Sequence, residues 1–148
     1  MYVLMKRQSM SKWYPLEGYP YADVNCNTRI EKMMDEIRRT RKNDELSETE
    51  KRAKIRAIYE AVVEVAFEHE CAYDRVIDYI NWLYSVDEDA AALDLAIKLF
   101  NTLKDMVNPN LNALEAICNR LEELAYEVGL EDEELMDEIL FTRVRHDV

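Results

Sequence analysis

The chain has 148 residues, of which 49% are hydrophobic and 34% are charged, and its formal net charge is −12. A chain with this hydrophobic content is not expected to be intrinsically disordered. No apolar run approaches the roughly 18 residues that a membrane-spanning helix needs. The length suits one ordinary domain whose core needs no disulfide or metal. Residues 1–57 hold thirteen Lys and Arg against nine Asp and Glu, whereas residues 58–148 hold six against twenty-two, a net charge of −16.

Residues 1–26 have no helical period but are rich in aromatic side chains. The aromatic residues are Tyr2, Trp13, Tyr14, Tyr19 and Tyr21. We predict an extended arm here, whose aromatic side chains either pack across the helices or insert into a neighbouring subunit or partner. The segment lacks the apolar stretch and cleavage site of a signal peptide, so a cytoplasmic location is expected.

Residues 27–148 are predicted to form a single all-α domain, a bundle of about five helices. Only two Gly and three Pro occur in the chain, and apolar residues recur at helical spacing through this region. The first helix is expected to begin at Thr28, which has capping-box spacing to Glu31, and to end near Lys42.

A second capping box, from Ser47 to Glu50, begins an apolar pattern that continues without a helix breaker to Tyr84. Unbroken, this helix would measure about 55 Å at ~1.5 Å per residue, which is longer than a small domain is wide. The stretch therefore forms either one long, bent helix or two helices joined at a kink.

The next two helices are separated at Asn108-Pro109. Ser85 is expected to cap the first of them, and Val107 is expected to be its last core position. In the second, apolar residues from Leu111 to Val128 are spaced alternately three and four apart, which is typical of antiparallel bundle packing.

Gly129 fits the position just after a helix end, and the acids at residues 131–134 begin a final helix that ends in the bases at residues 143–146. Acids first and bases last complement the helix dipole, so much of this charge pattern has a structural cause. Glu134 and Glu138 also lie one turn apart, which makes them candidates for a second acidic contact row.

The stretch from Glu48 to Tyr84 carries the acidic surface that we expect to bind a partner. Taken as one helix, it places six carboxylates on less than half of its circumference. These are Glu60, Glu64, Glu68, Glu70, Asp74 and Asp78. Phe67 and Trp82 fall on the same side and are candidate hydrophobic anchors among the acids. His69 falls on the opposite, apolar side and is expected to be a hydrogen-bonded core histidine.

A basic cluster flanks the turn between the first two helices and is the candidate contact at the other end of the molecule. Its candidate residues are Arg38, Arg39, Arg41, Lys42, Lys51 and Arg52. Asp44 and Glu45 interleave with them, and the rest of the chain repels phosphate, so direct nucleic-acid binding is not expected.

The three cysteines, Cys26, Cys71 and Cys118, are odd in number and far apart. Their spacing matches neither a disulfide framework nor a zinc site, so we expect reduced, mostly buried thiols. The two histidines, His69 and His146, lie in no recognisable catalytic setting, and the chain has no Gly-rich phosphate loop. We therefore expect no enzyme activity, no metal site and no cofactor.

The favoured hypothesis is a protein that binds a basic protein surface through its acidic helical face. Small acidic helical phage proteins that block nucleases have this general character, so an inhibitor that mimics nucleic acid is one form of the hypothesis. The alternative is a scaffold protein that assembles head-to-tail into an oligomer through its basic end and its acidic face. Neither hypothesis involves a membrane.

Overall fold

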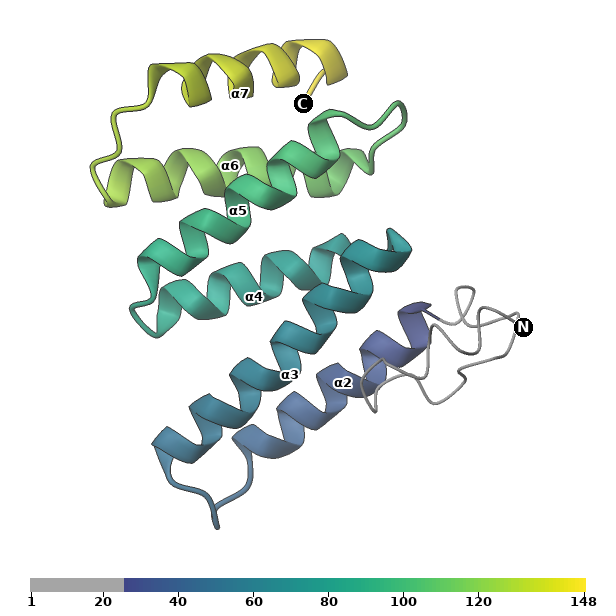
Figure 1. Ribbon diagram of the computed structural model, residues 1–148, viewed down its shortest axis with the longest axis vertical. Helices are drawn as coiled ribbons and strands as arrows, with labels where there is room; N and C mark the ends of the chain where they lie inside the picture. Colours follow the sequence, from purple (N-terminus) through teal and green to yellow (C-terminus); the bar gives the residue numbers. More distant parts are fainter. Residues whose placement is uncertain (1–25) are drawn as a thin grey trace. The chain divides into compact units, whose positions relative to one another are not determined.

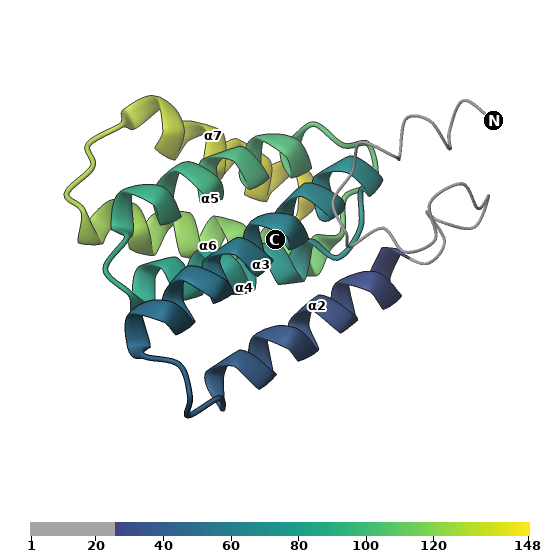
Figure 2. The same ribbon diagram turned by 60° about the horizontal axis from the view of Figure 1, so that its bottom comes forward.

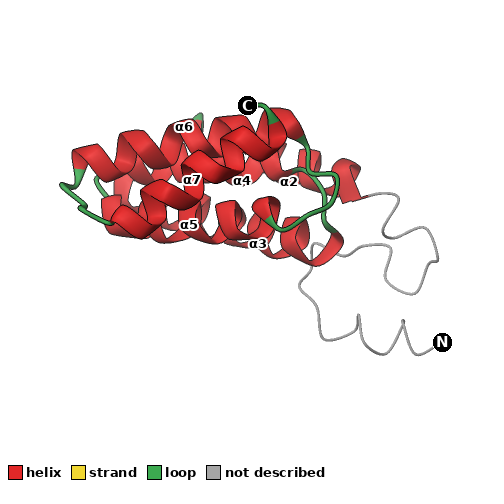
Figure 3. Cartoon of the chain, turned by 90° about the horizontal axis from the view of Figure 1, so that it is seen from above, coloured by secondary structure: helices red, strands yellow, loops and turns green. Residues whose placement is uncertain are grey.

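The computed structural model describes residues 26–148, and every regular element in this range is an α-helix (Figures 1 and 3). The helices are α2 (Cys26–Arg41), α3 (Glu48–His69), α4 (Tyr73–Ser85), α5 (Asp89–Lys104), α6 (Leu111–Glu127) and α7 (Glu133–His146). The all-α prediction is confirmed, with six helices here where about five were expected. The predicted aromatic arm lies, apart from Cys26, outside the described residues.

The chain divides into two compact units, residues 1–76 and residues 77–148, and the boundary falls after the first turn of α4. The single domain over residues 27–148 therefore stays a prediction. No helix within residues 26–148 is both long enough and apolar enough to cross a membrane.

The first unit is built on a helical hairpin in which α2 packs along α3 (Figures 1 and 2). The predicted stripe of α2, from Ile30 to Ile37, is buried, and it meets the buried face of α3, which includes Ile58 and Val62. Burying such side chains contributes about 1.5–3 kcal/mol each. At the start of α3 the predicted capping box is present, because Glu50 N donates to Ser47 Oγ and Ser47 N donates to the Glu50 carboxylate.

The stretch from Glu48 to Tyr84 forms two helices, and the break lies at residues 70–72. Glu70 and Ala72 both have positive φ angles, 51° and 50°, and the backbone N–H groups of Glu70 and Cys71 both bond to the carbonyl of Ala66. A left-handed conformation is expensive for residues that carry a Cβ atom, at roughly 1–2 kcal/mol each. The break therefore occurs without the Gly or Pro that would reveal it in the sequence.

Cys26 and Cys71 are joined in a disulfide, which corrects the prediction that all three cysteines are reduced. Their Cα atoms are 6.7 Å apart although 45 positions separate them in the chain. The prediction failed because it used spacing along the sequence, whereas the break after α3 brings Cys71 beside the first turn of α2. Cys118 is a free, buried thiol, as expected.

The second unit has a core formed where α5 packs on α6 and α6 packs on α7 (Figure 1). Phe100 and Leu103 from α5 and Leu114 and Leu121 from α6 are fully buried. The prediction that Val107 belongs to this core is wrong, since its side chain is 90% exposed. The reason is that α5 ends at Lys104, so the helical period no longer governs residue 107.

The starts and ends of the helices in this unit follow from local chemistry. Glu88, and not Ser85, occupies the N-cap of α5, because Ser85 is still the last residue of α4 and its hydroxyl donates to the carbonyl of Trp82. At the end of α6, Gly129 has φ +68°, and Leu130 N donates to the carbonyl of Ala125 at 2.8 Å. This is the predicted glycine-terminated helix end.

Candidate protein-interaction surfaces

The first unit carries a row of carboxylates along α3. Glu60, Glu64 and Glu68 are exposed and lie one turn apart. The Glu60 carboxylate lies 3.9 Å from Arg56 Nε, at the limit of an ion pair, and Glu64 forms no ion pair with any described residue. Like charges at this spacing repel by roughly 0.2–0.5 kcal/mol per pair.

The helix break redistributes the remaining predicted carboxylates. Glu70 is the C-cap residue of α3, and Asp74 lies exposed in the first turn of α4. Arg75 lies beside Asp74 but donates two hydrogen bonds, of 2.9 and 3.0 Å, to the carboxylate of Glu31 on α2. Asp78 lies on α4 in the second unit. Because α3 ends at His69, the six acids do not share one continuous helix.

The two predicted aromatic anchors are half-buried within their own units. The Phe67 ring lies 6.0 Å from the ring of Tyr73, and the Trp82 ring stacks on Tyr79 at 6.0 Å. Burial, together with the nearby Glu70, raises the pKa of Tyr73. Each anchor can therefore offer only part of its ring to a partner.

The two predicted acids of α7 have different surroundings. Glu138 accepts a 2.7 Å hydrogen bond from Lys104 Nζ, which itself lies 5.8 Å from the centre of the Phe100 ring. Glu134 is exposed and lies at the edge of a hollow of about 180 Å³ that Lys104 and Glu138 also line. Of these two acids, Glu138 is neutralised within the chain.

Half of the predicted basic cluster is engaged by neighbouring groups. Arg38 pairs with Asp35, and Arg39 pairs with Glu36 at 2.6 Å. Lys51 Nζ lies 3.8 Å from Glu48 and donates to the carbonyl of Arg41. These contacts remove much of the positive excess that the sequence suggests.

Glu36 is the centre of a small ion-pair network between α2 and α3, because Lys54 Nζ from α3 also reaches its carboxylate, at 3.3 Å. The hydrogen bond from Arg39 is the largest cause that lowers the pKa of Glu36, and Lys54 adds to it. The predicted basic residues that form no ion pair with a described residue are Arg41, Lys42 and Arg52. Within the predicted basic cluster, the cations without an ion pair to a described residue therefore lie at or beside the turn between α2 and α3.

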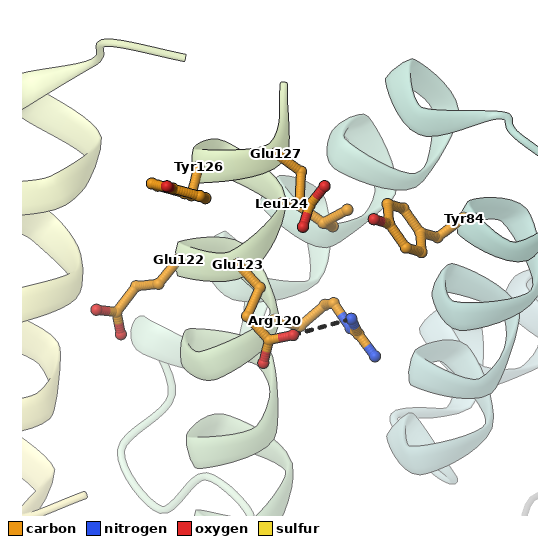
Figure 4. A pocket seen from close by; sticks show the side chains of 7 residues that line it. All are labelled: Tyr84, Arg120, Glu122, Glu123, Leu124, Tyr126 and Glu127. Atoms are coloured by element: carbon orange, nitrogen blue, oxygen red, sulfur yellow. Dashed lines mark hydrogen bonds and ion pairs between the residues drawn. The ribbon is translucent and has the colours of Figure 1, made fainter. Parts of the chain in front are cut away.

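A groove of about 540 Å³ lies against α6 in the second unit (Figure 4). It is lined by Tyr84, Arg120, Glu122, Glu123, Leu124, Tyr126 and Glu127. Arg120 donates to Glu123 at 3.2 Å, and a hydrogen bond to Glu127 is the main cause that raises the pKa of Tyr84. Figure 4 shows Tyr84 facing Glu127 and Leu124, whereas Glu122 points away.

The sequence prediction missed this groove. Tyr126 is 87% exposed at the groove although it follows the buried Ala125, and nothing in the helical period marks it as a surface aromatic of interest. The one available signal was the like-charged pair Glu123 and Glu127, one turn apart. Tyr84 could not be assigned to the groove because α4 and α6 are distant in the sequence.

Within residues 26–148, no group of three or more His, Cys, Asp or Glu side chains is placed to hold a metal ion. Comparison with protein-family models, with curated proteins and with solved structures returned no match. The described residues thus form an all-helical protein with three notable surface features. These are an acidic row on α3, an acidic and aromatic groove on α6, and a short basic turn between α2 and α3.

Proposed function

We propose that this protein acts by protein–protein contact and that the α3 side of its first unit binds a basic surface of a partner. We call this surface the α3 acidic face. It consists of Glu60, Glu64, Phe67, Glu68, Glu70 and Asp74. No step of this function requires a catalytic group, a metal or a cofactor.

The proposal rests on which acids are paired with Lys or Arg side chains of the same chain and which are not. Arg39 and Lys54 converge on Glu36, Lys104 pairs with Glu138, and Arg143 donates to Glu122 at 3.0 Å. Glu64, by contrast, forms no ion pair with a described residue and is flanked by two like charges. A cationic partner relieves this repulsion and is steered toward the face during encounter.

The groove on α6 is a second acidic surface, but its carboxylates already have partners within the chain, since Arg143 holds Glu122, Arg120 holds Glu123 and Tyr84 bonds to Glu127. The exposed ring of Tyr126 beside them suits a Lys or Arg side chain, whose stem packs on the aromatic ring. Tyr is also enriched among residues that dominate binding energies at interfaces.

Nucleic-acid-binding proteins are one class of partner with the required basic surface. A more specific version of the proposal is that this protein inhibits such a partner by imitating the negative charge of nucleic acid. The spacing of the acids limits it. Carboxylates one turn apart repeat about every 6 Å along α3, whereas duplex DNA carries one charge per ~1.7 Å. A single row is too sparse, so the proposal rests on a basic protein surface and not on imitation of DNA.

A cytoplasmic location stays a prediction. The disulfide between Cys26 and Cys71 weighs against it, because disulfides persist mainly in oxidising compartments.

The alternative function is head-to-tail self-assembly. One observation favours it: Arg41, Lys42 and Arg52 lie at one turn and form no ion pair with a described residue, so they are available to the α3 acidic face of another copy. Such a contact is heterologous and extends into chains unless it closes into a ring. Sedimentation of a Lys42→Glu, Arg52→Glu variant tests it, because that variant should lose any salt-sensitive assembly.

The proposed function is tested by capture from cells of the native host with the full chain as bait. A Glu60→Lys, Glu64→Lys, Asp74→Lys variant removes the face. An Asp94→Lys, Asp105→Lys, Glu115→Lys variant, at exposed acids of the second unit, is the matched control with the same change in net charge.

The wild-type chain and the control should retain the same basic protein, and about 1 M salt, where the Debye length is ~3 Å, should release it. The face variant should retain none while keeping its helical circular dichroism. Equal capture by all three chains, or capture unaffected by salt, would refute the proposal.

A further inference from the structure

The outer side of α7 exposes three large apolar side chains in succession. Leu140 is 59% exposed, Phe141 is 68% exposed and Val144 is 74% exposed. The inner side of the same helix carries Ile139 and Thr142, which are buried. Helix α7 thus has an apolar side in addition to the one that faces the core of its unit.

These three side chains form one continuous strip. At ~100° per residue, Val144 lies about 40° and Phe141 about 100° around the helix from Leu140. Water-exposed apolar strips that join several large side chains are uncommon on monomeric proteins and mark contact sites. We call Leu140, Phe141 and Val144 the α7 strip.

Charges of opposite sign flank the two ends of the α7 strip. Glu134 and Asp137 are exposed on its N-terminal side, and Arg145 is exposed on its C-terminal side. None of these three forms an ion pair with a described residue, unlike the neighbouring Arg143, which is held by Glu122 and Asn119. The strip therefore has a negative end and a positive end, and neither end is paired with a described residue.

We propose that the α7 strip binds the α7 strip of a second copy of this chain, with the two helices antiparallel about a two-fold axis beside Phe141. Asp137 and Arg145 each lie four residues from Phe141, so this arrangement places Asp137 opposite the partner subunit's Arg145, twice. A parallel arrangement would instead set the acids of one copy against the same acids of the other.

The contact is self-complementary and closes at two copies, so it differs from head-to-tail assembly and does not depend on the proposed function. A helix of 14 residues is about 21 Å long, and one face of it buries less than the ~1,200 Å² of a standard stable interface. The dimer is therefore weak and forms at high concentration or when other contacts hold two copies together.

The test is sedimentation equilibrium of the full chain from about 10 μM to about 1 mM. Asp137→Arg and Arg145→Asp each place like charges opposite each other in a homodimer, so each should weaken self-association at least about tenfold, equivalent to ~1.4 kcal/mol. An equimolar mixture of the two variants restores both ion pairs across the contact and should dimerise about as well as wild type.

Phe141→Glu should also abolish the dimer, and Val107→Glu is its matched control, since Val107 is an exposed apolar residue of the same unit that lies outside α7. The control should dimerise like wild type. A wild-type chain that is monomeric at about 1 mM, a dimer unaffected by Phe141→Glu, or a variant mixture that does not pair would overturn the inference.

The competing occupant is the segment over residues 1–25. A monomeric chain in which Trp13→Ala and Tyr14→Ala increase hydroxyl-radical labelling of Phe141 would assign the strip to that segment and would likewise overturn the inference.

Discussion

Cys26 and Cys71 join the first turn of α2 to the turn that follows α3, so a covalent bond closes the end of the helical hairpin opposite its loop. Nearer the loop, the ion pair of Glu36 on α2 with Lys54 on α3 links the two helices. Because most of the α3 acidic face lies on α3, the disulfide also holds the end of that helix, where Glu70 is the C-cap residue.

Reduction should destabilise the first unit. A crosslink between residues 45 positions apart lowers the conformational entropy of the unfolded chain, and the loop-entropy estimate of the resulting stabilisation is about 4 kcal/mol. Urea unfolding should therefore shift to a clearly lower midpoint when a phosphine reductant is added. The reductant should have no further effect on a Cys26→Ala, Cys71→Ala chain, and an unchanged wild-type midpoint would contradict the assignment.

Stability should fall at alkaline pH through Cys118. Burial raises the pKa of its thiol, so the folded state holds the proton to higher pH than the unfolded state does. This contribution is fully present below the unfolded pKa of about 8.5 and is lost as the pH rises toward the folded pKa. Unfolding free energies between pH 7 and 10 should decline less steeply in Cys118→Ala, and parallel profiles would count against this explanation.

The Glu36 network should contribute stability that disappears in acid. Its pKa is lowered, so the contribution is present above the unfolded pKa of about 4.3 and is lost as the pH falls through the folded pKa. Glu36→Gln should cost roughly 0.2–1 kcal/mol per pair at neutral pH, since these pairs are partly exposed.

Glu64→Gln is the matched control for Glu36→Gln. Glu64 is exposed, forms no ion pair with a described residue, and lies between Glu60 and Glu68. Its neutralisation should raise stability by roughly 0.2–0.5 kcal/mol per like-charged pair removed. If both variants lost stability equally in thermal unfolding at pH 7, the network around Glu36 would have no special role.

A glycine at the break between α3 and α4 should stabilise the protein. Ala72 has φ 50°, where a Cβ atom is unfavourable, so Ala72→Gly should gain about 0.5–1 kcal/mol. Ala57→Gly, at an exposed position inside α3, should instead lose about 1 kcal/mol. Chemical denaturation of the two variants in parallel measures the difference, and a loss in both would show that residue 72 is not strained.

The sequence predicted several features that depend on neighbouring residues, although the expected helix cap at Ser85 was wrong. The Ser47–Glu50 capping box, the buried stripe from Ile30 to Ile37, and the glycine-terminated end of α6 all follow from side chains within one or two turns. Local sequence patterns could not predict the helix break at Ala72, because no Gly or Pro occurs there.

The surfaces were predictable only in part, because their character depends on distant residues. The sequence identified Glu138 as a free acid, but Lys104, 34 positions earlier, neutralises it. The sequence also assigned Arg38 and Arg39 to the basic contact, although Asp35 and Glu36, which lie only three residues before them, hold both. The groove beside Tyr126 needs α4 next to α6, and no local pattern encodes that proximity.

Zero-length crosslinking of the full chain to its captured partner shows directly whether the α3 acidic face is the surface that binds. A carbodiimide joins a carboxylate to a lysine amine only where the two groups touch, and mass spectrometry then locates the bond. We predict crosslinks from Glu60, Glu64, Glu70 or Asp74 to lysines of the partner. Crosslinks confined to acids outside the α3 acidic face, such as Asp94 or Glu115, would contradict it.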